Sequence, residues 1–319
     1  MISLSDIEAA SRRIGPYIIR TPLLRQPALD PLLGCEVYLK HEGLQITGSF
    51  KIRGATNKIL TLTPDELQRG VVCASSGNHA MGVACAAQRL GVKAVIVMPE
   101  NANPTKLKGA RSYGATVLQT GSLSTQREDE MRKLAEEEGM IEIHPYGDPL
   151  VVAGQGTIGL EIMEDLPDLE AVVVPIGGGG LISGIATAIK SNRPDTRIIG
   201  VEPAGCPRYS MSRKEKCCVR LDSVQTIADG TMTDRAHPAN FEMIEALVDD
   251  LVVADDDWIK RAMKRVVADA KIVAEPSSVM GIASGLAGKV EGIAGKKVCF
   301  ILSGGNNDLT QLAEIIKAD

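Results

Sequence analysis

Short, uninterrupted apolar runs recur along this 319-residue chain and alternate with segments of helical pattern. Apolar runs of four or five residues without polar alternation are typical of parallel strands buried on both faces. The predicted strands are residues 71–74, 94–98, 115–118, 171–174, 198–201 and 298–302. Predicted helices cover residues 79–90, 104–113 and 122–138, the second with a proline in its first turn. This alternation predicts an α/β architecture.

The length of the chain and its 44% hydrophobic content suffice for two domains of ordinary size. The strand and helix alternation restarts inside the chain, which predicts that one domain is inserted in the other. We expect a small inserted domain over residues 64–146 and a large domain built from residues 1–63 plus 147–319. A ligand is expected at the carboxyl ends of the parallel strands.

The formal net charge is −5, with acidic and basic residues well mixed. No basic face indicates a nucleic-acid partner, and no polybasic run indicates a membrane surface. No apolar run approaches the roughly 20 residues of a membrane span. The seven cysteines lack a paired spacing, and the first residues do not resemble a signal peptide. These features favour a cytoplasmic protein that acts on a small molecule.

Lys51 stands beside Phe50 and between two glycines, at the predicted start of a helix. Burial against the ring and the positive end of the helix dipole would both lower the pKa of its ammonium group. A neutral amine can attack an aldehyde, which is the chemistry that a covalent cofactor anchor needs. For an isolated lysine, a solvated position on a helix face is the ordinary alternative.

Four consecutive glycines, residues 177–180, join a predicted strand to a helical pattern that continues from Leu181. Without side chains, their amides can approach a phosphate closely, and the helix dipole favours the anion there. Each glycine costs roughly 0.5–1 kcal/mol of backbone entropy relative to alanine, which a mere flexible turn does not explain. The run therefore predicts a phosphate site.

A second glycine pattern, Gly154 to Gly159, spells the dinucleotide fingerprint G-x-G-x-x-G after the apolar residues 150–153. A dinucleotide site also needs an acidic residue about 20 positions further on, at the end of the next strand. That strand ends in Pro175-Ile176-Gly177, without a carboxylate. An NAD-dependent oxidoreductase is therefore the less favoured alternative from another enzyme class. A non-catalytic protein that only binds a phosphate ligand is a third.

Two further loops follow apolar runs, namely Ser75-Ser76-Gly77-Asn78-His79 and Ser303-Gly304-Gly305-Asn306-Asn307-Asp308. In this order with Lys51 and the glycine run, they resemble the fold type II pyridoxal-phosphate (PLP) enzymes, specifically the threonine/serine ammonia-lyase (dehydratase) and serine racemase family. The lead-in at residues 40–45 and the segment 153–157 extend the resemblance over almost the whole chain. It implies a tryptophan synthase β-like fold, in which two open, twisted α/β lobes hold the cofactor between them.

The resemblance also implies roles for individual residues. Ser303 faces the pyridine nitrogen of PLP, where a serine can leave the ring neutral and a weaker electron sink than an aspartate would. Asn78 donates to the phenolic oxygen of the ring. The expected catalytic residues are Lys51 and Ser76. The expected cofactor-binding residues are Phe50, Lys51, Asn78, Gly177, Gly178, Gly179, Gly180, Leu181 and Ser303. The expected substrate-binding residues are Ser75, Ser76, Gly77, Asn78 and His79, although His79 and the whole loop also read as an ordinary helix start.

The predicted reaction is PLP-dependent β-elimination, which deaminates L-threonine or L-serine to 2-oxobutanoate or pyruvate and ammonia. Ser76 would lie on the ring face opposite Lys51, where a second proton relay permits inversion at Cα without excluding the lyase. Serine racemase and 3-hydroxyaspartate dehydratase are therefore alternatives with the same cofactor. The resemblance further implies a homodimer or homotetramer.

Family members that bind a divalent metal carry a glutamate followed four and six residues later by a small residue and an aspartate. This chain has Glu202, Cys206 and Arg208 at those positions, and the positive charge of Arg208 argues against a magnesium or manganese site. We therefore predict no metal. Residues 255–257 are three aspartates that read as the start of a helix. Weaker candidates near the substrate are Arg127, Tyr146 and Glu275.

Overall fold

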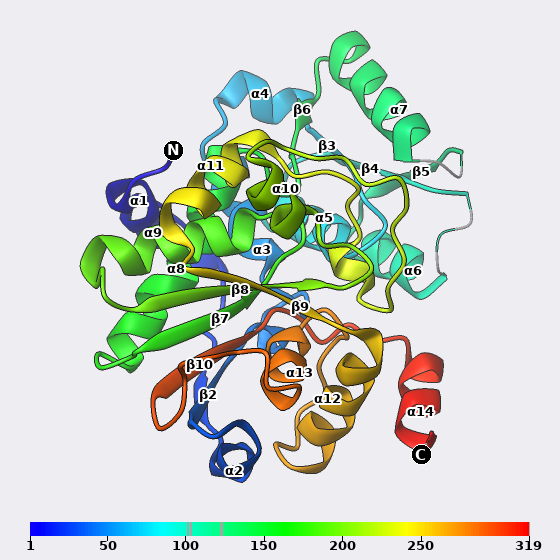
Figure 1. Cartoon of the computed structure of the whole chain (residues 1–319). Helices are drawn as coiled ribbons and strands as arrows, with labels where there is room; N and C mark the ends of the chain where they lie inside the picture. Colours follow the sequence, from blue (N-terminus) through cyan, green and yellow to red (C-terminus); the bar gives the residue numbers. More distant parts are fainter. Residues whose placement is uncertain (101, 103, 122–123, 319) are drawn as a thin grey trace.

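The computed structural model describes residues 1–100, 102, 104–121 and 124–318. Its larger sheet has six strands in the order β1-β2-β10-β7-β8-β9, and Figure 1 shows it in the lower half of the view. The strand pairs are parallel except for β1 with β2. The strands are β1 (Leu23–Arg25), β2 (Glu36–His41), β7 (Ala171–Pro175), β8 (Arg197–Pro203), β9 (Asp250–Ala254) and β10 (Lys297–Leu302).

The second sheet has four parallel strands in the order β5-β4-β3-β6, in the upper right of Figure 1. They are β3 (Val71–Ala74), β4 (Ala94–Met98), β5 (Thr116–Gln119) and β6 (Ile141–Glu142). The parallel α/β architecture expected from the apolar runs is confirmed. All four strands fall inside the segment 64–146 that we expect to form the small domain, whose boundaries remain a prediction.

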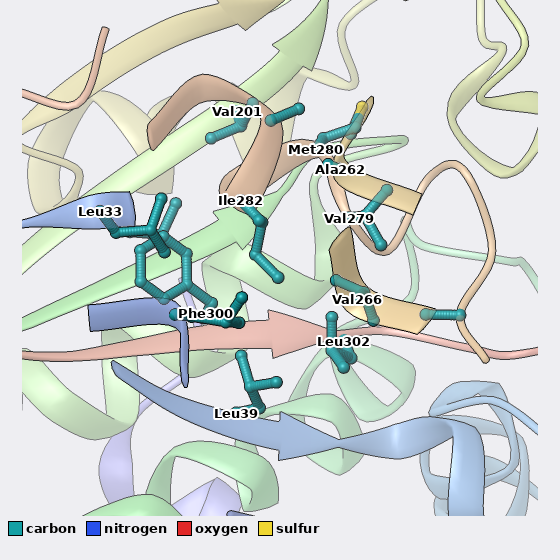
Figure 2. Packing of buried hydrophobic residues seen from close by; sticks show 14 of the residues in the cluster. Leu33, Leu39, Val201, Ala262, Val266, Val279, Met280, Ile282, Phe300 and Leu302 are labelled. Atoms are coloured by element: carbon teal, nitrogen blue, oxygen red, sulfur yellow. The ribbon is translucent and has the colours of Figure 1, made fainter. Parts of the chain in front are cut away.

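Buried side chains of alternating orientation hold the larger sheet between two apolar layers. In β10, Phe300 and Leu302 enter one layer, whereas Ile301 enters the other. Figure 2 shows the first layer, where Phe300 packs near Leu39 of β2 and Ile282 of α13 (Met280–Leu286). Strands covered on both faces must be apolar at every position, which explains the uninterrupted runs in the sequence.

The three helices predicted at residues 79–90, 104–113 and 122–138 correspond to Asn78–Leu90, Pro104–Ser112 and Ser124–Glu137 in the structure, and residues 122 and 123 lie outside the described part of the chain. Within the described ranges, none of the helices combines the length and the apolar character that crossing a membrane requires. The helices are α1 (Leu4–Ile14), α2 (Asp30–Leu33), α3 (Lys51–Ile59), α4 (Pro64–Arg69), α5 (Asn78–Leu90), α6 (Pro104–Ser112), α7 (Ser124–Glu137), α8 (Pro149–Asp165), α9 (Gly180–Asn192), α10 (Arg208–Glu215), α11 (Pro238–Leu247), α12 (Asp256–Ala268), α13 (Met280–Leu286) and α14 (Leu309–Lys317).

The G-x-G-x-x-G string lies in the middle of α8, not at a turn between a strand and a helix. Its glycines allow close helix packing: a Cβ on Gly154 would lie 2.7 Å from Cα of Gly54 in α3. A Cβ on Gly156 would lie 2.9 Å from the carbonyl oxygen of Gly184 in α9. Backbone amides inside a helix are already bonded and cannot receive a pyrophosphate. This placement argues against the dinucleotide hypothesis.

Candidate active site

The Lys51 loop is joined directly to the loop that follows β10, although about 250 residues separate them in sequence. The amide of Phe50 donates to the carbonyl of Ser303 at 3.1 Å, and the amide of Gly305 donates to the carbonyl of Gly48 at 2.9 Å. Ser49 and Gly304 form an isolated antiparallel bridge between them. These bonds place the start of α3 at the carboxyl end of the central strand β10.

Lys51 is the first residue of α3, as predicted, and it is partly buried. Its Nζ donates to the carbonyl of Pro145 at 2.8 Å and lies 5.2 Å from the centroid of the Phe50 ring. Removal of the ammonium group from water lowers the pKa of Lys51 to about 8. A substantial fraction of this amine is therefore neutral near physiological pH, which the expected chemistry requires.

A buried ion network holds the first turn of α3. Arg53 has no exposed side-chain surface and donates to both oxygens of Glu42 at 2.8 Å. It also donates to Glu161 of α8 at 2.6 Å, and Lys40 of β2 reaches the same carboxylate at 2.6 Å. Burial opposes ionisation of Glu42, but the Arg53 guanidinium outweighs it and lowers the pKa of that carboxyl. The network ties α3 to strand β2 of the larger sheet and to helix α8.

The four-glycine run connects β7 to α9, as predicted, and has no room for side chains. A Cβ on Gly178 would lie 2.1 Å from the Tyr146 ring, and one on Gly180 would lie 2.9 Å from the Tyr146 carbonyl oxygen. Gly179 has φ of +88°, a conformation that favours glycine. The carbonyl of Gly178 accepts from Asn240 at 2.7 Å and from Tyr209 at 2.8 Å. Leu181 follows in the first turn of α9 and is buried.

Asn78 lies at the first position of α5 and is held by two residues from other loops. Its side-chain nitrogen donates to both oxygens of Glu275, at 2.9 and 3.0 Å. Its side-chain oxygen accepts from the side-chain nitrogen of Asn306 at 2.8 Å. The backbone amide of Asn306 donates to Glu275, also at 2.8 Å. Glu275, a weak candidate from sequence, thus contacts two residues of the predicted loops. The contribution of Asn306 was not predicted, although it stands inside the Ser-Gly-Gly-Asn-Asn-Asp motif.

Ser303 lies just beyond β10 and is 7% exposed. Its hydroxyl is 3.1 Å from that of Ser278, a residue that was not among the predicted site residues. The Ser278 hydroxyl also donates to the Gly304 carbonyl at 2.6 Å and accepts from the Gly304 amide at 2.7 Å. Ser278 therefore fixes the turn that presents Ser303.

The loop between β3 and α5 carries Ser75, Ser76 and Gly77, all partly buried. The amide of Gly77 donates to the Ser75 hydroxyl at 3.3 Å, which shapes the turn. His79 is buried, and its Nε2 lies 2.7 Å from the Ile143 carbonyl. Burial lowers the pKa of His79 to about 3, so the ring is neutral. This geometry favours the structural role for His79 over contact with a substrate.

The remaining candidates lie at several places in the fold. Glu202 and Arg208 are both fully buried, 3.7 Å apart. Arg127 lies on α7, partly buried, and its role at an entrance stays a prediction. The three aspartates at 255–257 form the N-cap and first turn of α12, as predicted. In the ranges that the structure describes, no three His, Cys, Asp or Glu side chains converge on a metal-sized space.

Comparison with known proteins gives one consistent result. The family model described as "Pyridoxal-phosphate dependent enzyme" matches residues 14–304. The L-threonine ammonia-lyase of Thermotoga maritima is 44% identical over 99% of this chain and 78% of its own length. The structure of maize serine racemase superposes with a TM-score of 0.95 at 37% identity, over 98% of this chain and 96% of the racemase. The processed form of threonine deaminase isoform 2 from Solanum lycopersicum superposes with a TM-score of 0.93 at 38% identity, over 98% of this chain and 86% of the deaminase.

Proposed function

The chain belongs to the pyridoxal-phosphate dependent enzymes, and we propose that it deaminates L-threonine and L-serine by β-elimination. The products would be 2-oxobutanoate or pyruvate, with ammonia. One observation carries the proposal: Lys51 is a partly buried amine with a pKa of about 8, on a helix joined to the Ser303 loop. The names of the threonine ammonia-lyase and threonine deaminase relatives support deamination and threonine as a substrate, and L-serine is proposed from the family resemblance.

The residues present fit PLP. The run Gly177 to Gly180 places bare backbone at the start of α9, and a Cβ on Gly178 would lie 2.1 Å from the Tyr146 ring, so a side chain is excluded there. Backbone amides at a helix N-terminus suit a phosphate. Phe50 stands beside Lys51 and can flank the ring. Asn78 and Ser303 supply polar side chains for the phenolic oxygen and the pyridine nitrogen.

When bound, PLP supplies an electron sink for the charge that develops at Cα of the amino acid. Lys51 would remove the Cα proton, because its depressed pKa leaves a neutral amine that can accept it. Ser75, Gly77 and the start of α5 would bind the substrate carboxylate, an interaction that backbone amides at a helix N-terminus favour. The carboxylate of Glu275 keeps the Asn78 amide oriented.

Serine racemisation is a second candidate, because Ser76 supplies a hydroxyl in the loop that precedes α5. A base on each face of the substrate permits inversion at Cα, whereas one base returns the proton to the same face. The overall likeness to maize serine racemase supports this candidate. Comparison of D-serine formation by the native enzyme and by Ser76→Ala separates the two. Loss of D-serine with ammonia release retained assigns racemisation to Ser76, and no D-serine from the native enzyme removes the candidate.

The main test measures ammonia and 2-oxoacid from L-threonine, L-serine and 3-hydroxyaspartate. We expect turnover of threonine and serine by the native enzyme and at least a 1,000-fold loss, on the order of a missing catalytic base, in Lys51→Ala. Lys58→Ala is a matched control on the same helix, since Lys58 pairs with Asp148 away from Lys51. Full activity of Lys51→Ala would disprove the assignment. Turnover of 3-hydroxyaspartate alone would replace the proposed substrates.

Two broader expectations are also proposals. A cytoplasmic location is supported by the unpaired cysteines, all of which are free in the structure. A homodimer or homotetramer is supported by the family resemblance. Light scattering of the protein as it elutes from a size-exclusion column measures the molar mass of the assembly. A mass of 33.9 kDa, that of a single chain, would contradict the oligomer.

A further inference from the structure

Arg208 is a buried charged side chain to which the reaction proposed above gives no part. It is the first residue of α10, and none of its side chain is exposed. A buried guanidinium loses its hydration, so its place in the fold must be compensated by hydrogen bonds and an opposite charge. The acceptors around Arg208 therefore indicate what the residue does.

Most of those acceptors are backbone carbonyls, one of the first glycine in the run and one of the residue before it. Nη2 of Arg208 donates to the carbonyl of Gly177 and, at 3.2 Å, to that of Ile176. Nη1 donates to the carbonyl of Cys206 at 2.8 Å. The guanidinium thus connects the loop after β7 with the connection that leads from β8 to α10.

The opposite charge comes from Glu202, whose Oε1 lies 3.7 Å from Nη1 of Arg208. Glu202 is itself fixed, because it accepts from the amides of Tyr209 and Ser210 at 2.9 and 2.7 Å. Burial raises the pKa of Glu202, and Arg208 opposes that rise. The pair is therefore anchored to the larger domain by backbone bonds on both sides.

The contact with the Gly177 carbonyl sets the direction of an amide. A trans peptide is planar, so the N–H of Gly178 points away from the side on which the Gly177 carbonyl lies. The next peptide is held in the same manner, since Asn240 and Tyr209 bind the Gly178 carbonyl. Three side chains therefore hold two consecutive peptide planes, and with them the directions of the Gly178 and Gly179 amides.

We propose that Arg208 is a positioning residue for the cofactor phosphate: it acts as a permanent internal cation that orients the amides of the glycine run. The inference rests on the proposed function, since it takes the glycine run as the phosphate site. The Glu202–Arg208 pair would then raise the affinity for the cofactor in addition to stabilising the fold.

The test compares two ligands of the full-length apo-protein, PLP and pyridoxal, which lacks the phosphate. Dissociation constants are measured by absorbance titration for the native protein, Arg208→Lys and Arg208→Met. Arg213→Met is the matched control, because Arg213 lies on the same helix and also donates to two backbone carbonyls, those of Ile244 and Val248, but not to the glycine run. Circular dichroism establishes that each variant is folded.

We expect Arg208→Met to weaken PLP binding roughly 10- to 100-fold, the contribution of one or two hydrogen bonds from a charged donor. Pyridoxal binding should change less than threefold, because the effect acts through the phosphate. Arg208→Lys keeps the charge but loses the planar fork of the guanidinium. Its PLP affinity should therefore lie between those of the native protein and Arg208→Met. If Arg208→Met does not fold, Arg208→Lys alone tests the inference, by the ratio of its dissociation constants for PLP and for pyridoxal.

Equal losses for PLP and pyridoxal would overturn the inference, because they indicate a general structural defect. So would native PLP affinity in either folded Arg208 variant, or a loss of similar size in Arg213→Met. A further variant, Arg208→Ala, leaves space for a free guanidinium ion. Millimolar guanidinium should restore its PLP affinity, whereas urea, which has a similar shape but no charge, should not; equal effects of the two would also overturn the inference. Failure of the native apo-protein to bind PLP would instead contradict the proposed function itself.

Discussion

Replacement of Arg53 by methionine should destabilise the protein more than any comparable change at its surface. Arg53 is fully buried and bonds both Glu42 and Glu161 at 2.6–2.8 Å. Methionine fills most of the space but leaves the buried Glu42 carboxylate without its guanidinium. Removal of one partner of a buried ion pair costs about 3–5 kcal/mol. With a urea m-value of roughly 3 kcal/mol per M, the unfolding midpoint should fall by about 1–1.7 M.

The matched control is Arg20→Met. Arg20 also bonds two carboxylates, those of Glu164 and Asp165, but its side chain is 49% exposed. Exposed pairs contribute about 0–1 kcal/mol, so this variant should shift the midpoint by less than about 0.3 M. Urea unfolding of both apo-proteins, followed by circular dichroism, measures the difference. Equal shifts for the two variants would refute the argument that burial, and not the number of ion pairs, makes the Arg53 network important.

Three further predictions concern the cofactor site. Capture of PLP by the apo-protein should accelerate as pH rises through about 8 and then level off, because Lys51 is protonated below that pKa and neutral above it; a rise that continues to about 10.4 would contradict the lowered pKa. Gly178→Ala should abolish PLP binding, since its Cβ would meet the Tyr146 ring at 2.1 Å. In the control Gly15→Ala no atom lies within 4 Å of the new Cβ, so this variant should bind PLP with native affinity. Treatment with a chelator should leave deamination unchanged, because the cation beside Glu202 is Arg208; recovery of lost activity by added magnesium would disprove this.

The sequence could predict most of the strand and helix pattern, because uninterrupted apolar runs report strands covered on both faces. The glycine run and the loops at Lys51, Asn78 and Ser303 could also be predicted, since each follows an apolar run or opens a helix. Strands β1, β2, β6 and β9 were missed, because none of them is both apolar throughout and buried at every position.

Contacts between loops distant in sequence could not be predicted in the same way. Asn306 meets Asn78 across 228 positions, and nothing in either local pattern specifies the pairing. Asn240 reaches the glycine run from α11, a helix for which no site motif was apparent. The G-x-G-x-x-G string illustrates the opposite error, because glycines that permit close helix packing spell the same pattern as a phosphate loop. The missing carboxylate after the next strand already argued against the dinucleotide site, and the structure shows what the glycines do instead.

The central claim, a PLP enzyme anchored through Lys51, is tested most directly by reduction of the protein with borohydride in the presence of PLP, followed by peptide mass spectrometry. We predict a single phosphopyridoxyl group on the peptide that contains Lys51 and none on that peptide in Lys51→Ala. Phosphopyridoxyl groups spread over several exposed lysines, or confined to a different lysine, would contradict the account.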